Sequence, residues 1–267
     1  MASDSVILVD GAPVTEADLI YLAMVDYGAY TSFRVEDGGV RGLDLHLARL
    51  EASAVELFGG SPGEARLREL MRQAIAGGGD SWLRVSLFSP EIRPREAGWH
   101  GCPRVMTAVF PSPPPLGQGL RVQPVRYGRE AAHLKHTAGF GLMRARRAAS
   151  AAGFDDALFT DADGLISEGT LWNIGLLRGE TVVWPQAPML AGVTQALIGR
   201  GLASVGLDAV CEPVRLADIG GFDGAFLCNS ATPACAITAI GAVDLPGSEA
   251  TIDRLRQAWR SNPRQSI

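Results

Sequence analysis

The chain has a single lysine, in the stretch His133-Leu134-Lys135-His136-Thr137, although 24 of its residues are lysine or arginine. A codon preference for arginine explains the other basic positions but not this exception. Arginine holds its proton too tightly to act as an amine nucleophile, whereas a desolvated lysine can be neutral near pH 7. Any amine chemistry by a side chain of this protein therefore falls to Lys135.

Composition places the chain among ordinary globular proteins. With 267 residues, 47% of them hydrophobic, it can bury the core of one large domain or two modest ones. A net charge of -5 argues against a surface that follows nucleic-acid phosphates. The apolar runs are too short to span a bilayer, and residues 1–10 lack the basic start of a signal peptide. We therefore expect a cytoplasmic protein with no nucleic-acid partner and no membrane partner.

The cysteines and histidines show no metal-binding pattern. The four cysteines are widely scattered without CxxC spacing, and the four histidines form no HExxH or similar array. The sequence therefore predicts no metal site.

Hydrophobic periodicity and turn signals predict a mixture of helices and strands. Asp10-Gly11 and Asp37-Gly38-Gly39 have the composition of hairpin turns between short strands. Apolar residues at three-to-four spacing predict two amphipathic helices, which end at Gly59 and at Gly77. The prolines of Pro111–Pro115 favour extended geometry. The sequence thus predicts a small N-terminal α/β domain at 1–110, a proline-rich linker at 111–119 and a larger domain at 120–267.

Two predicted turns have the composition of phosphate cradles. Gly192-Val193-Thr194 leads into a predicted helix, and Asn229-Ser230-Ala231-Thr232 follows a short buried strand. Backbone N–H groups at a helix start and hydroxyl side chains both donate to phosphate. Pyridoxal 5'-phosphate requires such donors, an amine for its aldehyde and an acid beside its pyridine nitrogen. Because Lys135 and Glu168 can supply the amine and the acid, the sequence predicts this cofactor.

Five motifs, in order along most of the chain, resemble those of the class IV aminotransferases, the pyridoxal-phosphate enzymes of fold type IV. They are the strand Tyr30–Val35, the helix His46–Ser53 with the pattern H-x-x-R-L-x-x-S, Lys135 followed by Ala152–Leu158, the E-G-x-x-x-N stretch Ile166–Ile174, and Leu190–Thr194, which is similar to L-x-G-I-T. The resemblance implies an α/β (α+β) fold with a small α/β domain, a larger β-rich cofactor-binding domain and a homodimeric assembly.

The resemblance also implies roles for individual residues. It makes Lys135 the Schiff-base lysine that moves the Cα proton, places Glu168 at the pyridine nitrogen and gives Arg49 a contact with the phosphate. The other residues that it implies in cofactor binding are Asn173, Gly192, Val193, Thr194, Ser230 and Ala231.

Three departures separate the chain from the branched-chain aminotransferases of this family. Phe140 stands where those enzymes have a tyrosine that reaches the cofactor's phenolic oxygen, and phenylalanine cannot donate that bond. Tyr30-Thr31-Ser32-Phe33-Arg34 replaces their F-E-G-x-R pattern, and Asn229-Ser230 replaces their G-T turn. We therefore do not expect a branched-chain substrate.

The same departures resemble features of another member of the family. Aminodeoxychorismate lyase, which eliminates pyruvate to release 4-aminobenzoate, is similar in Leu134-Lys135-His136, in a hydroxyl residue at Ser32 and in an asparagine at Asn229. The R-x-H loop that captures the substrate carboxylate in D-amino-acid aminotransferases is not reproduced here, and Arg93-Pro94-Arg95 is its nearest counterpart.

The leading hypothesis is an enzyme, a pyridoxal-phosphate aminotransferase that transfers an amino group between a small amino acid and an oxo acid. The alternatives are 4-amino-4-deoxychorismate lyase and a non-catalytic protein that binds the same cofactor, whose signature would be loss of Lys135 or Glu168. Because amino transfer and the lyase reaction both begin with removal of the Cα proton, the cofactor residues do not distinguish these two reactions. The candidate substrate residues are Ser32, Arg34, Asn229, Phe140, Arg93 and Arg95. The amino donor and its L or D configuration stay open at this point.

Overall fold

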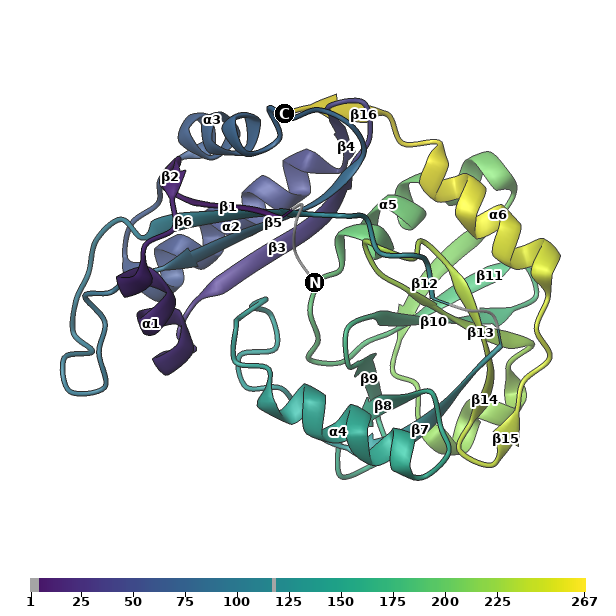
Figure 1. The fold of residues 1–267 in the computed structure, drawn as a ribbon. Coiled ribbons are helices and arrows are strands. Elements are labelled where there is room, and N and C mark those ends of the chain that lie inside the picture. The colour runs from purple at the N-terminus through teal and green to yellow at the C-terminus, as the bar shows by residue number, and fades with distance from the viewer. Residues whose placement is uncertain (1–4, 117–118) are drawn as a thin grey trace. The chain divides into compact units, whose positions relative to one another are not determined.

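The chain divides into two compact units in the computed structural model, which describes residues 5–116 and 119–267 (Figure 1). The first unit comprises Met1–Pro114, Leu134–Ala138 and Arg264–Ile267, and the second comprises Pro115–His133 and Gly139–Pro263.

This division differs from the predicted domains in two segments. Leu134–Ala138 and Arg264–Ile267 join the first unit, although the predicted larger domain of 120–267 contains both. The boundary itself follows Pro114, inside the predicted linker 111–119. Gly117 and Gln118 of that linker lie outside the described residues.

The first unit is built on a five-stranded antiparallel sheet with the strand order β2-β1-β6-β5-β3. The strands are β1 (Val6–Val9), β2 (Ala12–Pro13), β3 (Ala29–Val35), β5 (Ser81–Phe88) and β6 (Arg104–Phe110). A separate pair joins β4 (Gly39–Arg41) to β16 (Arg264–Ser266). The hairpin turns predicted at Asp10-Gly11 and Asp37-Gly38 are confirmed, because both residues of each turn have positive φ values.

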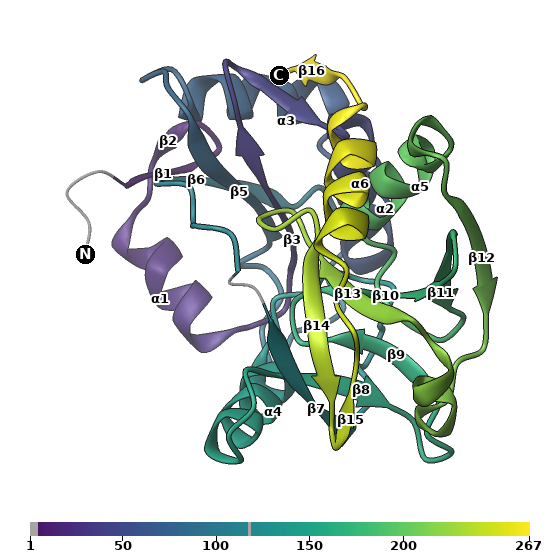
Figure 2. The ribbon, with the colours of Figure 1, turned by 90° about the vertical axis from the view of Figure 1, so that its right-hand side faces the viewer.

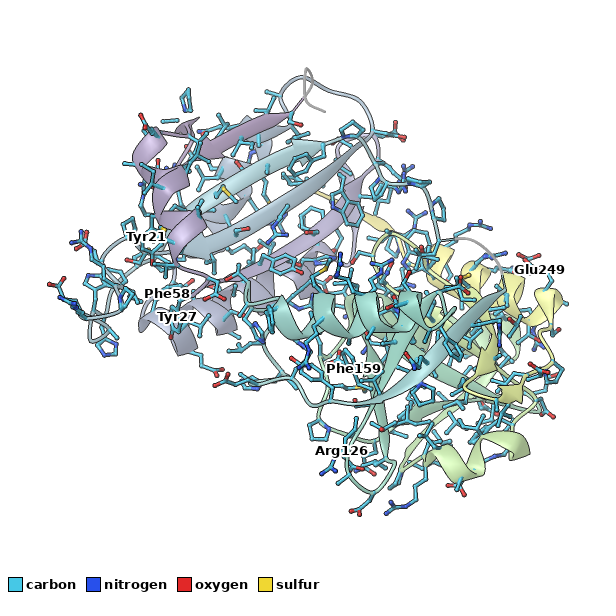
Figure 3. The ribbon with its side chains drawn as sticks, turned by 60° about the horizontal axis from the view of Figure 1, so that its bottom comes forward. Tyr21, Tyr27, Phe58, Arg126, Phe159 and Glu249 are labelled. Atoms are coloured by element: carbon cyan, nitrogen blue, oxygen red, sulfur yellow. The ribbon has the colours of Figure 1, made fainter. Side chains whose placement is uncertain are left out.

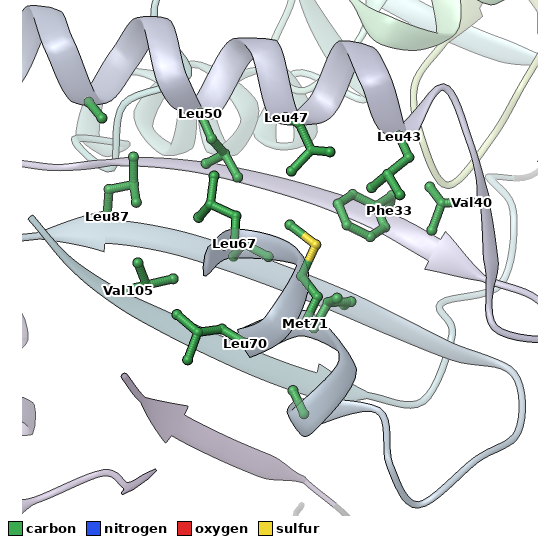
Figure 4. Close-up of a cluster of buried hydrophobic side chains, with 14 of the residues drawn as sticks. Phe33, Val40, Leu43, Leu47, Leu50, Leu67, Leu70, Met71, Leu87 and Val105 are labelled. Atoms are coloured by element: carbon green, nitrogen blue, oxygen red, sulfur yellow. The ribbon is translucent and has the colours of Figure 1, made fainter. Parts of the chain in front are cut away.

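The core of the first unit lies between this sheet and the helices α2 (Leu43–Phe58) and α3 (Glu64–Ala74). Figure 4 shows the apolar side chains that α2 and α3 direct at the strands. They are Leu43, Leu47, Leu50, Leu67, Leu70 and Met71, packed with Phe33, Leu87 and Val105. Burying each of these large side chains contributes roughly 1.5–3 kcal/mol. Gly59 ends α2 in the left-handed conformation, as the sequence predicts. The shorter helix α1 (Glu16–Met24) buries only Asp18.

The second unit is a mixed sheet in the order β12-β11-β10-β13-β14-β7-β8-β9, with β15 beside β14 (Figure 2). Its strands are β7 (Leu120–Arg126), β8 (Asp156–Thr160), β9 (Ile166–Gly169), β10 (Asn173–Arg178), β11 (Thr181–Pro185), β12 (Asp208–Glu212), β13 (Gly224–Cys228), β14 (Cys235–Ile240) and β15 (Val243–Asp244). One pairing, between Glu168 of β9 and Asn173 of β10, closes part of this sheet into a ring. Glu168 and Asn173, the first and last residues of the E-G-x-x-x-N motif, therefore lie where the ring closes.

The helices of the second unit are α4 (Phe140–Ala151), α5 (Val193–Gly201) and α6 (Glu249–Arg260), with short 3-10 segments η1 (Leu202–Val205) and η2 (Leu216–Gly221). Small residues of α4 pack on Phe159 of β8, which is labelled in Figure 3. The predicted α/β (α+β) fold class, with a β-rich second part, is confirmed. In the described parts of the chain, no helix is both long and apolar enough to cross a membrane.

Candidate active site

The lysine segment Leu134–Ala138 lies along the outer edge of β3. The N–H of Tyr30 donates to the carbonyl of Lys135 at 2.9 Å, and the N–H of Thr137 donates to the carbonyl of Gly28 at 2.9 Å. Ala29 and His136 form an antiparallel bridge between these two bonds. The first unit thus fixes the backbone of Lys135 as it would fix a short extra strand.

The ring of Tyr30 contacts two cations, Arg84 and Lys135. The guanidinium carbon of Arg84 is 3.7 Å from the centre of the Tyr30 ring, and Lys135 Nζ is 4.8 Å from it. Burial lowers the pKa of Arg84, and Tyr30 partly offsets that shift. Since alternate residues of a strand share a face, Ser32 lies beside Tyr30, and it is paired in register with Arg84. Ser32 is therefore placed near a cation that the sequence reasoning missed.

Arg34 shares that face of β3 but makes a different contact. Its Nη2 donates to the carbonyl of Pro113 at 3.0 Å, within the predicted linker. The contact gives Arg34 a part in holding the chain after β6, and its predicted substrate role stays a prediction.

The opposite face of β3 meets α2 through a buried polar pair. Thr31 Oγ1 and His46 Nδ1 are 2.6 Å apart, and both residues are buried. Burial, followed by the like charges of Arg49 and Lys135, holds the pKa of His46 well below its usual 6.5. Burial also lowers the pKa of Arg49, to about 10, so this side chain stays cationic at neutral pH. A neutral imidazole thus lies one helical turn from a cation. We call Tyr30, His46, Arg49, Arg84 and Lys135 the lysine cluster.

Glu168 lies buried in the second unit, where two donors hold its carboxylate. Arg129 Nη1 is 3.2 Å from Oε1, and the N–H of Leu190 donates to Oε2 at 3.3 Å. The side chains of Arg129 and Glu168 are 7% and 8% exposed, so water screens their attraction little. Arg129 also donates to the carbonyl of Ala132 at 2.9 Å, which ties the loop before Lys135 to the acid.

Asn173 connects Glu168 to the predicted phosphate cradle. Its Nδ2 donates to the carbonyl of Leu190 at 2.8 Å, the residue whose N–H bonds Glu168. Gly192 caps the start of α5, and a Cβ at Gly192 would collide with Asn173 Oδ1. The contact gives Asn173 a part in shaping the cradle. We call Arg129, Glu168, Asn173, Leu190 and Gly192 the acid cluster.

The cradle has the chemistry that a phosphate group needs. Val193 and Thr194 are buried at the first turn of α5, where backbone N–H groups have no partner within the helix. The absence of a side chain at Gly192 leaves room for the amide of Asn173 beside the start of α5. These residues fit the phosphate of pyridoxal phosphate, and the carboxylate of Glu168 fits its pyridine nitrogen.

The second predicted cradle is a turn that Asn229 holds together. Asn229 Oδ1 accepts from the N–H groups of Ala231 at 3.0 Å and Thr232 at 2.8 Å, and its Nδ2 donates to the carbonyl of Leu171 at 3.3 Å. The amide oxygen therefore closes the turn itself, and the amide nitrogen anchors the turn to Leu171. Ser230 and Ala231 are half-buried in it, and their cofactor role stays a prediction.

Three other predicted substrate residues are exposed. Phe140 opens α4 with 80% of its surface exposed. Arg93 and Arg95 are exposed on the loop between β5 and β6, where Arg93 Nε donates to the carbonyl of Pro90 at 3.2 Å. None of these three residues belongs to the lysine cluster or to the acid cluster.

Arg129 and Arg84 are the functional candidates that sequence reasoning missed. Arg129 is 39 positions from Glu168, and nothing local distinguishes it from the other arginines. Arg84 is paired in register with Ser32, so a correct alignment of β3 with β5 would have revealed it.

Comparisons with known proteins agree with the predicted family and fold type. The model of the family described as amino-transferase class IV matches residues 28–240. A probable branched-chain-amino-acid aminotransferase of Rickettsia felis is 32% identical over 42% of this chain, but that match spans only 38% of the Rickettsia protein. A putative branched-chain-amino-acid aminotransferase of Methanocaldococcus jannaschii is 26% identical over 76% of this chain and 75% of its own length.

Among solved structures, the branched-chain aminotransferase of Thermoproteus uzoniensis with norvaline has the same fold. It superposes with a TM-score of 0.83 at 21% identity and covers 96% of this chain and 94% of its own. The predicted family, fold type and cofactor class are confirmed. The chain belongs to the class IV aminotransferase family, whose enzymes depend on pyridoxal 5'-phosphate.

Proposed function

We propose that this protein is a pyridoxal-phosphate aminotransferase that moves an amino group between a small amino acid and an oxo acid. The observation that carries the proposal is the buried carboxylate of Glu168, held by Arg129 and by the N–H of Leu190. A nearby cation favours the ionised form of a carboxyl group. An ionised acid of this kind can hold a proton on the cofactor's pyridine nitrogen.

Several residues of the two clusters then have a task. Bound pyridoxal phosphate supplies an electron sink for the charge left at the substrate Cα. Lys135 Nζ would attach the cofactor and would move the Cα proton. Glu168 would hold the pyridine proton, while Arg49 and the N–H groups of Val193 and Thr194 would bind the phosphate. Asn173 keeps Leu190 and Gly192 in place.

The substrate side of the proposal rests on Tyr30, Ser32 and Arg84. Amino acids and oxo acids both carry a carboxylate, and a guanidinium binds that group with two parallel hydrogen bonds. Arg84, stacked on Tyr30 and paired in register with Ser32, supports carboxylate binding at this face. Ser32 supplies a hydroxyl that can donate to the substrate or accept from it.

The donor is best identified with a panel rather than by analogy. The curated relatives are named branched-chain-amino-acid aminotransferases. This chain departs from the pattern of such enzymes at Ser32, Phe140 and Asn229. The panel of candidate donors therefore contains L-leucine, L-isoleucine and L-valine, together with alanine and glutamate in both the L and the D configuration.

Colour and half-reactions test the proposal. Purified protein supplied with pyridoxal phosphate should be yellow, should bleach with borohydride and should convert an amino acid to its oxo acid. The variant Lys135→Arg should lose all three properties. A protein that stays colourless would overturn the proposal. Release of pyruvate and 4-aminobenzoate from aminodeoxychorismate, with no half-reaction on any amino acid, would replace it with the lyase.

We also propose a homodimer. The surface of α1 supports it, since Leu19, Ile20 and Met24 are 49%, 57% and 78% exposed there. Adjacent exposed apolar side chains on one helix are typical of interaction surfaces. Light scattering should give twice the mass of the chain, and Met24→Glu should shift the population toward monomer.

We propose a cytoplasmic location for the protein. No disulfide joins its cysteines, all of which lie in described parts of the chain. Thiols that stay reduced are typical of the cytosol. Cell fractionation with antibody detection tests the location.

A further inference from the structure

Asp156, at the start of β8, has a buried carboxylate that is surrounded by donors. The residue is 4% exposed. Thr170 Oγ1 is 2.8 Å from one carboxylate oxygen and 3.0 Å from the other, and Trp172 Nε1 donates at 2.9 Å. The N–H of Ala157 adds a bond at 2.8 Å, and Arg146 Nε of α4 is 4.0 Å away. Two of these donors come from a single turn, residues 169–172.

That turn connects Glu168 directly to Asn173. The N–H of Gly169 donates to the carbonyl of Trp172 at 2.8 Å. A Cβ at Gly169 would collide with the indole of Trp172, so the ring lies against the glycine backbone. Glu168 precedes the turn, Asn173 follows it, and the two are paired across β9 and β10. Any displacement of Trp172 or Thr170 therefore reaches the backbone of Glu168.

We propose that Asp156 is a positioning residue, which fixes the backbone of Glu168 by holding Thr170 and Trp172. The proposal rests on the function proposed above for Glu168. It gives Asp156 a role in the reaction although its carboxylate bonds the turn and not Glu168 itself. The pair of donors explains why the residue is an acid. An indole N–H can only donate, and a carboxylate offers two accepting oxygens without any donor of its own.

An amide at this position would disturb the turn without changing the size of the side chain. In Asp156→Asn, one accepting oxygen becomes an NH₂ group, which cannot accept from Thr170 or Trp172. The neighbouring Asp155 provides a matched control. It is exposed, and its Oδ2 accepts from the N–H of Arg121 at 2.7 Å, away from residues 169–172.

Hydrogen exchange of the full chain without cofactor tests the positioning role. We expect Asp156→Asn to speed amide exchange in the peptide 166–173 by roughly tenfold or more, because bonds to a charged acceptor are lost. Asp155→Asn should leave that peptide within about twofold of wild type. Thr170→Val and Trp172→Phe each remove one donor while keeping the side-chain shape, and they should give intermediate increases. These two variants decide the question if Asp156→Asn does not fold.

The protein loaded with pyridoxal phosphate provides the second readout. A displacement near the chemistry lowers turnover by up to about a hundredfold, and we expect Asp156→Asn to lower kcat in this range with KM for the donor little changed. The pH titration of the bound cofactor's absorbance should also shift, since Glu168 moves relative to the group it contacts. Asp155→Asn should show neither effect.

The outcomes separate this inference from the proposed function. Unchanged exchange in 166–173 for Asp156→Asn, Thr170→Val and Trp172→Phe would overturn the positioning role. Faster exchange with a wild-type absorbance titration would also overturn it, because the turn would then matter only for stability. A wild-type protein that binds no pyridoxal phosphate would overturn the proposed function, and the exchange experiment would still show whether Asp156 holds the turn.

Discussion

Lys135 and Glu168 are secured by different kinds of contact. In the lysine cluster, backbone bonds along β3 hold the main chain of Lys135, while its amine lies over the ring of Tyr30. In the acid cluster, Arg129 and the N–H of Leu190 bind the carboxylate of Glu168 itself. A cation over an aromatic ring is worth about 0.5–2 kcal/mol, and each hydrogen bond to a charged group about 1.5–3 kcal/mol.

The difference matches what each group has to do. An amine that moves a proton needs a fixed attachment and a mobile tip, whereas an acid that holds a proton on a ring nitrogen needs a fixed tip. The lysine cluster should therefore tolerate changes around the amine better than the acid cluster tolerates changes around the carboxylate.

Lys135→Arg is the strongest change, because it removes the amine and keeps a cation beside Tyr30. We expect amino transfer to fall by at least about a thousandfold, since arginine does not lose its proton at neutral pH. The thermal midpoint should stay close to that of wild type. Single-turnover assays with each donor measure the loss. Substantial remaining turnover would show that the amine is not part of the reaction.

Arg129→Met leaves a buried carboxylate without the cation that the structure places beside it. We expect the free energy of unfolding to fall by about 3–5 kcal/mol, the usual cost of breaking a buried ion pair. Adding Glu168→Gln should recover part of this loss, because the uncompensated charge is removed. Urea unfolding of the two single variants and the double variant gives the coupling. Strictly additive losses would mean that the two side chains act independently.

Gly192→Ala tests how tightly the cradle is packed against Asn173. The added Cβ collides with Asn173 Oδ1, so we expect a loss of about 1–3 kcal/mol in stability and weaker binding of pyridoxal phosphate. Gly199→Ala is the matched control on the same helix, because no atom lies within 4 Å of its added Cβ. That variant should gain about 0.5–1 kcal/mol from the lower entropy of its unfolded chain. Equal effects at both positions would contradict a packed cradle.

His46 gives the smallest effect, which depends on pH. Because burial lowers its folded-state pKa well below 6.5, the unfolded chain binds an extra proton below that pH. The contribution of His46 is therefore constant above about pH 6.5 and is lost as the pH falls, at up to about 1.4 kcal/mol per pH unit. His46→Asn should remove this slope. Unfolding of both proteins between pH 5 and pH 8 measures the difference, and parallel curves would contradict the buried neutral imidazole.

Local patterns predicted much of the fold and part of the site. The spacing of leucines located α2, and paired Asp-Gly turns located two hairpins, because both signals depend on residues close in sequence. The motif around Glu168 predicted an acid for the cofactor's pyridine nitrogen, and the structure shows this residue in the second unit, buried beside Arg129. Hydrogen bonds through Leu190 and Asn173 link Glu168 to the segment before α5, so the motifs Ile166–Ile174 and Leu190–Thr194 are in contact.

Pairings between distant segments could not be predicted in this way. The contact of Arg129 with Glu168 depends on how the loop after β7 folds back, and no periodicity records that path. The attachment of Leu134–Ala138 to β3 has the same character, since the segment has no strand pattern of its own. The amide of Asn229 shows a related limit: an asparagine in a turn suggests a ligand or a turn former, and only the bonds to Ala231 and Thr232 reveal the second role.

The strand β16 has a consequence for how the protein is made. It pairs with β4, Ile267 packs against the core of the first unit, and Arg68 Nη1 donates to the carbonyl of Ser266 at 2.8 Å. During synthesis, these residues leave the ribosome after the whole second unit has emerged. The unit that is translated first is therefore completed last, and its exposed β4 edge needs protection from other chains until β16 arrives.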